Sequence, residues 1–246
     1  AGQVLTVNSG ASAGEWADAG GGADLYAANE SSPTAQPSAT GTNSIAIGNS
    51  VTSSGTNSFA AGSFTTATGN NSVAISGSVS ALYSTSAAGP ASIVIGNGAS
   101  SSLSATSSLA LGSGATTAGT RATALTKSYA SGTDSFAAAI GNNTSSYGAS
   151  GANSIAIGQL SKATAANSIA IGDTAISTTA NQIALGGATD TVKISNTYTL
   201  PTSDGTANQV LTTDGSGAVT FADAGGGGAD LLVENYNGTS TLPTAT

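Results

Sequence analysis

The chain has 246 residues and a formal net charge of −8, and only 7% of its residues are charged. It contains no Cys, His or Met, which excludes a disulfide scaffold, a zinc or haem site built on Cys or His, a thiol nucleophile and a Ser-His-Asp triad. Its four basic residues are scattered and cannot form the basic footprint of a nucleic-acid-binding protein.

The segment 1–30 predicts a short β connector with a glycine-rich hinge. Gln3-Val4-Leu5-Thr6 is typical of a strand, and a second strand ends near the aromatic Trp16, with a turn rich in Gly and Ser between them. Gly20 to Gly22 then predict a flexible joint. Residues 31–42 predict a Pro/Ser/Thr linker. Because the sequence begins at Ala1 rather than Met, we expect a processed product or an internal piece of a longer polypeptide.

A six-residue phrase, Asn43-Ser44-Ile45-Ala46-Ile47-Gly48, recurs through residues 43–195, which we predict to be a repeat domain. Copies begin at positions 43, 57 and 71 and again at 153, 167 and 181, so both blocks have the same 14-residue period. Weaker copies begin at 91, 107, 121 and 134. The copies that follow positions 71 and 134 begin only at 91 and 153, which is later than the period requires and predicts one coil plus an inserted loop in each place.

Large apolar and small side chains alternate within each phrase, and this period of two is typical of a strand. The glycine that ends the phrase allows a sharp turn with positive φ, and the second half of each unit contains another short strand and another turn. One period of the repeat therefore predicts one coil of two strands. Stacked coils predict an all-β fold, a parallel β-roll solenoid, whose roughly ten coils at about 4.8 Å each give a length on the order of 50 Å.

The predicted roll is too narrow to bury all of its apolar residues. Its interior accepts side chains such as Ala46, whereas Ile45 and Ile47 project from the opposite face of the same strand. Burial of a large aliphatic side chain is worth about 1.5–3 kcal/mol, and an exposed stripe of isoleucines would cause aggregation. We therefore predict a homotrimer in which one strand face of each chain turns towards a central axis, and the sequence leaves open whether the Ile or the Ala face does so.

Stacking predicts columns of equivalent residues, among which the asparagines can form a hydrogen-bonded ladder. The residues expected to carry the repeat are Asn43, Ile45, Ile47, Gly48, Asn57, Asn71, Asn153, Ile155, Ile157, Gly158, Asn167, Ile169, Ile171, Gly172 and Asn181.

Residues 196–224 repeat the N-terminal connector. Gln209-Val210-Leu211-Thr212 matches the first predicted strand of the chain, and Phe221-Ala222-Asp223 matches Trp16-Ala17-Asp18. Residues 225–246 contain a second glycine hinge and the start of a further module. Nine of the twelve acidic residues lie at 15–30 or 204–234, so the connectors are acidic and the repeat domain is nearly uncharged. This organisation predicts one period of a longer rod.

Two resemblances follow from these motifs. The phrase with its regular period resembles the head repeats of trimeric autotransporter adhesins, the YadA-like family, over roughly residues 43–190, which implies left-handed parallel β-rolls assembled as trimers. The stretch from Tyr198 to Gly217 is similar to a connector of bacteriophage tail fibres, which are trimeric and elongated. Together they imply a structural segment of a tail fibre or other virion appendage that supports host attachment. The alternative is the head region of a trimeric bacterial adhesin at the cell surface.

We expect no catalytic, cofactor-binding or metal-binding residues and no enzyme activity. Asp134 and Asp173 are expected about three coils apart, which is too far for the carboxylate pair of a glycosidase, and a fibre-borne glycan hydrolase is a remote alternative. Tyr83, Tyr129 and Tyr147 lie in or near the irregular coils and are candidates for surface recognition of a host glycan or protein, the alternative being packing under loops or at the trimer seam. The expected partners are further copies of the chain and other fibre, baseplate or capsid proteins, without nucleic acid and without membrane insertion.

Overall fold

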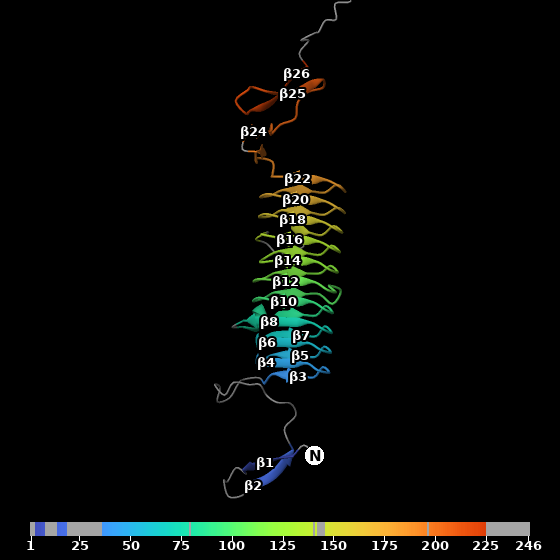
Figure 1. Ribbon diagram of the computed structural model, residues 1–246, viewed down its shortest axis with the longest axis vertical. Coiled ribbons are helices and arrows are strands. Elements are labelled where there is room, and N and C mark those ends of the chain that lie inside the picture. Colours follow the sequence, from blue (N-terminus) through green and yellow to red (C-terminus); the bar gives the residue numbers. More distant parts are fainter. Residues whose placement is uncertain are drawn as a thin grey trace, which may run out of the picture. The chain divides into compact units, whose positions relative to one another are not determined.

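Each coil of the repeat domain contributes one strand to each of two parallel ten-stranded sheets (Figure 1). The sheet that carries the repeated phrase is called the aliphatic sheet; its strands are, in spatial order, β4 (Ile45–Asn49), β6 (Phe59–Ser63), β8 (Val73–Gly77), β10 (Ile93–Ile95), β12 (Leu109–Leu111), β14 (Thr123–Leu125), β16 (Phe136–Ala138), β18 (Ile155–Ile157), β20 (Ile169–Ile171) and β22 (Ile183–Leu185). The opposite sheet is called the polar sheet; its strands are β3 (Ser38–Ala39), β5 (Thr52–Ser53), β7 (Thr65–Ala67), β9 (Thr85–Ala87), β11 (Ser100–Ser101), β13 (Thr116–Thr117), β15 (Tyr129–Ala130), β17 (Gly148–Ala149), β19 (Lys162–Ala163) and β21 (Ile176–Ser177).

The computed structural model describes residues 3–7, 14–18, 36–78, 80–139, 141, 146–195 and 197–224. The chain divides into two units, Ala1–Ala184 and Leu185–Thr246. The predicted glycine hinges at 20–22 and within 225–246 lie outside the described residues. Strand β3 lies within the segment 31–42, for which the sequence predicts a linker.

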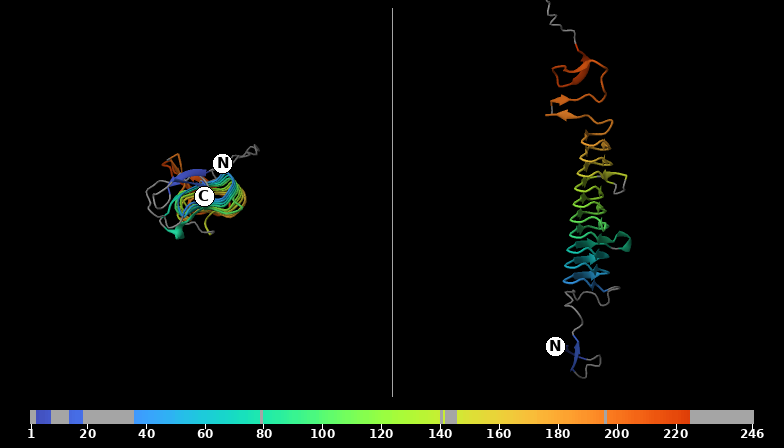
Figure 2. Two further views of the ribbon diagram at one scale, coloured as in Figure 1. Left: turned by 90° about the horizontal axis from the view of Figure 1, so that it is seen from below. Right: turned by 90° about the vertical axis from the view of Figure 1, so that its right-hand side faces the viewer.

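The strand register follows the repeated phrase. Ile45 pairs with Phe59, Phe59 with Val73 and Val73 with Ile93, so equivalent positions of successive phrases lie side by side even across the first insertion. The prediction of an all-β parallel solenoid of about ten coils is confirmed. The described helical structure is one 3-10 turn, η1 (Ala81–Tyr83), which lies in the first inserted loop and projects from the stack (Figure 2). Within the described residues no helix is long and apolar enough to cross a membrane.

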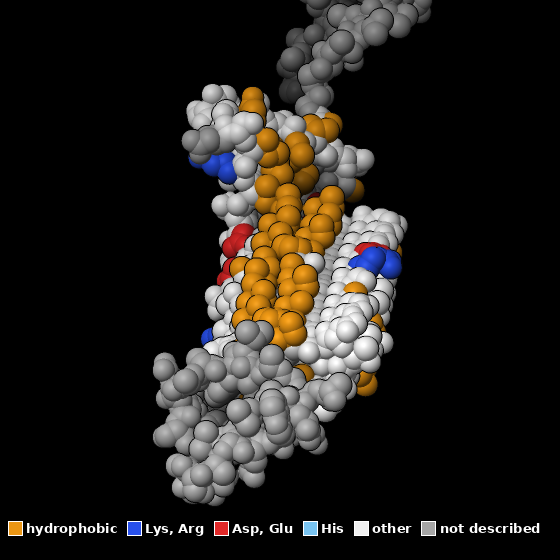
Figure 3. All heavy atoms as spheres, turned by 60° about the horizontal axis from the view of Figure 1, so that its bottom comes forward, with side chains coloured by type: hydrophobic (Ala, Val, Ile, Leu, Met, Phe, Trp, Pro, Cys, Tyr) orange, Lys and Arg blue, Asp and Glu red, His pale blue; other side chains and the backbone are white. Residues whose placement is uncertain are grey.

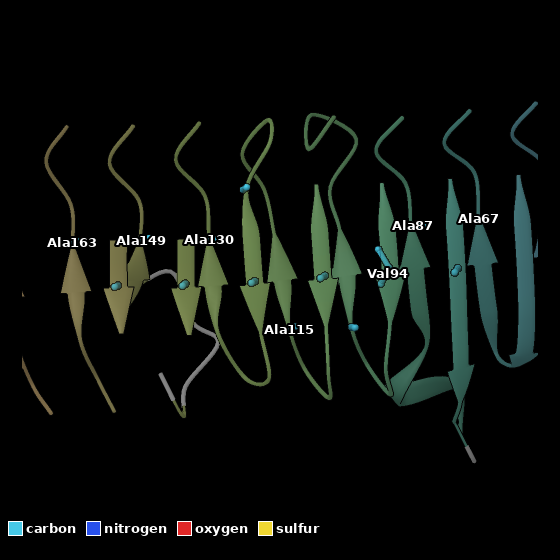
Figure 4. Close-up of a cluster of buried hydrophobic side chains, with 14 of the residues drawn as sticks. Ala67, Ala87, Val94, Ala115, Ala130, Ala149 and Ala163 are labelled. Carbon is cyan, nitrogen blue, oxygen red and sulfur yellow. The ribbon is translucent and has the colours of Figure 1, made fainter. Parts of the chain in front are cut away.

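Small side chains from both sheets fill the interior of the solenoid (Figure 4). The aliphatic sheet turns the middle residue of each phrase inward, so that Ala60 and Ala156 are fully buried, and the polar sheet contributes residues such as Ala67 and Ala163. Val94 is among the largest side chains that are fully buried there. Because interiors are close-packed and the space between the sheets accepts little more than a methyl group, the isoleucines of the same strands lie on the outside.

Two turns complete each coil. In the glycine turn, which leads from the aliphatic to the polar sheet, Gly158 has a φ of +121°, a region that L side chains rarely adopt. In the asparagine turn, which leads back, Asn153 has a φ of 54°, a left-handed conformation that asparagine tolerates better than most residues. The adjacent Ser154 is buried, and its Oγ donates a hydrogen bond of 2.7 Å to the carbonyl oxygen of Gly151. The same hydrogen bond to the residue three positions earlier is made by Ser44, Ser58, Ser92, Ser135 and Ser168.

The described strands outside the solenoid form antiparallel hairpins. Strand β1 (Gln3–Val7) pairs with β2 (Gly14–Asp18), and β25 (Gln209–Thr213) pairs with β26 (Val219–Asp223). Gln3 is opposite Asp18 just as Gln209 is opposite Asp223, so the duplicated connector sequence adopts the same register in both places. A third hairpin joins β23 (Lys193–Ile194) to β24 (Tyr198–Thr199).

Candidate interaction surface of the solenoid

The outer face of the aliphatic sheet carries a band of large apolar side chains (Figure 3). Two residues of each strand point outward, one on each side of the middle residue, which is buried in all strands except the terminal β4 and β22, and they form two parallel columns. These two columns, which we call the apolar band, are Ile45, Phe59, Val73, Ile93, Leu109, Thr123, Phe136, Ile155, Ile169 and Ile183, and Ile47, Ala61, Ile75, Ile95, Leu111, Leu125, Ala138, Ile157 and Ile171. Leu185 of β22 is left out because it begins the second unit, and Ala61, Thr123 and Ala138 are the members without a large apolar side chain.

The apolar band is more exposed than a single soluble chain tolerates well. Ile45, Ile93 and Ile171 have 43%, 44% and 40% of their surface exposed. With strands about 4.8 Å apart and alternate residues about 7 Å apart, the band is about 45 Å long and about 10 Å wide, or roughly 450 Å². Contiguous apolar patches of this size are often functional, and larger ones mark interaction sites. The band is therefore the strongest candidate site of the solenoid, with the chemistry of an interface that excludes water.

The outer face of the polar sheet has a different chemistry. Its outward residues on the first six strands all carry hydroxyl groups, and they are Ser38, Thr52, Thr66, Ser86, Ser100 and Thr116. Ser100 Oγ lies 3.4 Å from Thr116 Oγ1 and donates a hydrogen bond to it. Tyr129, Lys162 and Ile176 follow on later strands. Water can solvate the hydroxyl-rich part of this face, so the apolar band is the face whose burial against another surface would stabilise the solenoid.

The predicted asparagines lie in one column along the asparagine turns and form two short ladders. The Nδ2-to-Oδ1 hydrogen bonds run from Asn43 to Asn57 and from Asn57 to Asn71 (3.2 Å each), and from Asn153 to Asn167 (3.0 Å) and Asn167 to Asn181 (3.1 Å). These bonds are exposed to solvent, and a typical hydrogen bond adds about 0.5–1.5 kcal/mol to stability. The ladder therefore supports the stacking of the coils.

Arg121 and Asp134 occupy the same column where asparagine is missing. Arg121 donates from Nε to Asp134 Oδ1 (2.5 Å) and from Nη2 to Asp134 Oδ2 (2.6 Å). These hydrogen bonds hold the pKa of Asp134 below its ordinary value and raise the pKa of Arg121. Because both side chains are exposed, the pair adds little stability. The sequence analysis missed this pair, although the two residues begin consecutive copies of the phrase.

Asp134 and Asp173 do not lie together as a carboxylate pair. Asp134 precedes β16 and Asp173 follows β20, and only β18 lies between these strands, so the two acids are two coils apart and the expectation of about three was wrong. The second insertion adds residues between them without adding a coil. Asp134 lies in an asparagine turn and Asp173 in a glycine turn, so they also lie at opposite edges of the solenoid. Among the described residues no group of three or more His, Cys, Asp or Glu could hold a metal ion.

The three tyrosines considered for surface recognition do not form one cluster. Tyr83 ends η1, is 59% exposed and lies beside Gly98. Tyr129 is half-buried on β15, and Tyr147, just before the neighbouring β17, packs against the buried core. Strands β11 and β13 separate β9, which follows Tyr83, from β15. The structure thus places Tyr129 and Tyr147 on neighbouring coils and leaves Tyr83 apart from them.

The regular coils are similar to a known family of repeats. The family model for the YadA head domain repeat matches residues 38–50, 53–75, 104–125 and 149–175, which together make up less than half of the chain. The unmatched segments between them include both insertions. No curated protein matches the chain.

The fold and the matched repeats define a parallel β-solenoid with YadA-type head repeats. The chain is therefore similar to the head region of a trimeric adhesin. This similarity favours the adhesin alternative over the tail-fibre interpretation, which no comparison supports.

Proposed function

We propose that this chain belongs to the head of a trimeric adhesin on a bacterial cell surface, and that three copies bury their apolar bands against one another. The observation that carries the proposal is the apolar band itself, which covers one face of the solenoid from β4 to β22. The match to the YadA head domain repeat supports a trimer, because heads of that type are homotrimeric. In the proposed arrangement the Ile face turns towards the axis, which is one of the two possibilities that the sequence leaves open, because the Ala face fills the roll.

The energy available from the band is sufficient for association. Burial of one large aliphatic side chain is worth about 1.5–3 kcal/mol. Association of protein chains costs about 4–15 kcal/mol in lost translational and rotational freedom. The band's side chains are already about half buried in the single chain, so each contributes only part of this value on association, and the many large apolar side chains of the band together offset the cost.

In such a trimer the polar sheet and both rows of turns stay exposed. These surfaces carry hydroxyl groups, asparagine side chains and few charges, and they are the surfaces that an adhesin head of this kind offers to its target. Tyr83, which projects from the first insertion, remains a candidate contact residue in this proposal.

The mass of the assembly in solution, measured by light scattering, tests the trimer. We expect the wild-type chain to have the mass of three chains and Ile155→Asp to dissociate, because three carboxylates would enter an apolar layer. Thr116→Asp on the polar sheet is the matched control, because it adds the same charge to a face that stays in water. A wild-type chain that remains a monomer or a dimer at micromolar concentration would contradict the proposal.

The proposed location on the bacterial cell surface can be tested separately from the trimer. Antibodies raised against the solenoid should label intact cells of the source bacterium. If they label purified virus particles and leave cells unlabelled, the tail-fibre interpretation replaces the adhesin proposal.

A further inference from the structure

The C-terminal connector lacks a core of its own. None of the described residues of the second unit, 185–195 and 197–224, is buried, whereas every complete coil of the solenoid has buried residues. In the hairpin of β25 and β26, Val210 is 46% and Leu211 54% exposed. Since an isolated two-stranded hairpin is only marginally stable in water, something outside the described residues of this unit must complete the connector.

The polar groups of the connector are nevertheless well organised. Asp214 Oδ1 accepts hydrogen bonds from the backbone N–H groups of Ser216 (2.7 Å) and Ala218 (3.1 Å), which fixes the hairpin turn. Gln209 Nε2 donates to Asp223 Oδ1 at the open end of the hairpin (3.1 Å). The backbone therefore holds one defined shape, and what the connector lacks is apolar burial.

One face of the hairpin carries two large apolar side chains, of which one is partly covered and the other is exposed. Leu211 is directly opposite Phe221 in the strand register, so both side chains lie on the same face. The chain passes over Phe221 at Gly205, where an added Cβ would lie 2.6 Å from the ring Cγ. The ring is thus half covered by its own chain, while the adjacent Leu211 stays open.

We propose that the cover is supplied by the same connector of the other two copies, with Leu211 of each chain directed towards the common axis. This inference rests on the proposed trimer. A trimeric solenoid brings three connectors to a millimolar effective concentration without any new binding partner, because only the short segment 184–208 separates Ile183, the last residue of the apolar band, from Gln209.

The duplication of the connector favours sister copies over a foreign partner. Leu5 is opposite Trp16 in the N-terminal hairpin just as Leu211 is opposite Phe221 in the C-terminal one. A foreign protein would have to recognise the same element on both flanks of the solenoid, whereas the three chains of a trimer bring together three copies of each. The connectors would then hold the chains together beyond the solenoid.

The absence of cysteine allows a direct test in the full chain. Leu211→Cys and Val210→Cys place single thiols on opposite faces of β25. Under a mild oxidant we expect Leu211→Cys to form an interchain disulfide at least about tenfold faster than Val210→Cys, because its thiols are held close together. Three thiols at one axis can form only one disulfide, so the expected product is a covalent dimer with one unlinked chain.

The mass of the unoxidised protein separates the two proposals. A trimer in which Leu211→Cys cross-links no faster than Val210→Cys overturns the connector inference and leaves the adhesin proposal intact. A monomer overturns both.

Hydrogen exchange provides a second readout that does not depend on cysteine. Amides of residues 209–223 should be protected in the wild-type trimer and lose protection in Leu211→Asp, while the mass stays that of three chains and the solenoid amides stay protected. Wild-type amides in this segment that exchange as fast as an unstructured peptide would overturn the inference.

Discussion

Replacement of Gly158 by alanine tests whether the glycine turns limit how closely the coils can stack. Gly158 has a φ of +121°, and a Cβ added there would lie 2.6 Å from the carbonyl carbon of Gly172 in the next coil. Both atoms belong to the stack of coils, so the contact is relieved only by a shift of the backbone. Gly77 is the matched control, because it lies in the same sheet with no heavy atom within 4 Å of an added Cβ and no positive φ.

The two glycines lead to different expected energies. A residue held in a sparsely populated φ/ψ region costs about 1–3 kcal/mol, and forcing an extra carbon into a packed site costs about 1–3 kcal/mol more. Gly158→Ala should therefore lower the free energy of unfolding by about 2–6 kcal/mol. Gly77→Ala should leave it unchanged or raise it by up to about 1 kcal/mol, because alanine restricts the unfolded chain.

Thermal unfolding followed by far-UV circular dichroism measures the difference. For a chain of this size about 1 kcal/mol corresponds to roughly 2–4 °C in Tm, so Gly158→Ala should melt at least about 4 °C below the wild type. Both variants must be compared at one protein concentration, because the Tm of an oligomer depends on concentration. If the two variants melt together, the steric account of the glycine turn is wrong.

Three further predictions concern the ladder, the ion pair and the core. Asn167→Gly removes the ladder hydrogen bonds but keeps the turn conformation, so its free energy of unfolding should fall by about 1 kcal/mol. Asn167→Ala should lower the free energy of unfolding by about 1–2 kcal/mol more, because alanine is strained in the left-handed backbone conformation. Equal melting temperatures of the two variants would contradict this. The pKa of Asp134 is depressed in the folded chain by its hydrogen bonds with Arg121, so the pair stabilises the fold above the ordinary carboxyl range and this effect is lost as the pH falls through the depressed pKa. The small Tm advantage of the wild type over Asp134→Asn should therefore shrink below about pH 4, and an advantage that grows on acidification would reverse the sign argued here. Ala156→Leu should cost at least about 1–3 kcal/mol by overpacking, whereas the exposed Ala166→Leu should leave the melting curve nearly unchanged.

The register of the solenoid could be predicted from the sequence because the phrase and its regular period describe the strand and the coil together. The alternation in Ser44-Ile45-Ala46-Ile47 separates two faces, but it does not by itself say which face is inside. The distance between the sheets decides this, since the second strand of each coil also presents small inward residues such as Ala67. That distance is a property of both strands, and a pattern read from one strand does not contain it.

The irregular coils contain a signal that the sequence analysis did not use. The coils that begin at 71, 121 and 134 have Ser76, Thr126 and Ala139 at the position of the turn glycine, and the phrases that follow them begin at 91, 134 and 153, so none of these coils has the regular length. A residue with a Cβ cannot follow the φ of about +120° seen at Gly48 and Gly62, so the chain leaves the regular turn there and the coil changes length. Both insertions therefore occur in coils that lack the turn glycine, whereas the coil that begins at 121, which also lacks it, is one residue shorter than the regular coil.

The sequence indicates the proposed interaction surface of the solenoid but not that of the connector, and the reason is the number of exposed apolar residues in each. In the solenoid, the number of exposed isoleucines exceeds what one chain can bury, so a single sequence already indicates that a partner is needed. In the connector, two strands with one leucine and one aromatic residue on a face show no such excess. The need for a cover is indicated only by the hairpin's lack of a buried residue, and Leu211→Cys tests the proposal that other copies supply this cover.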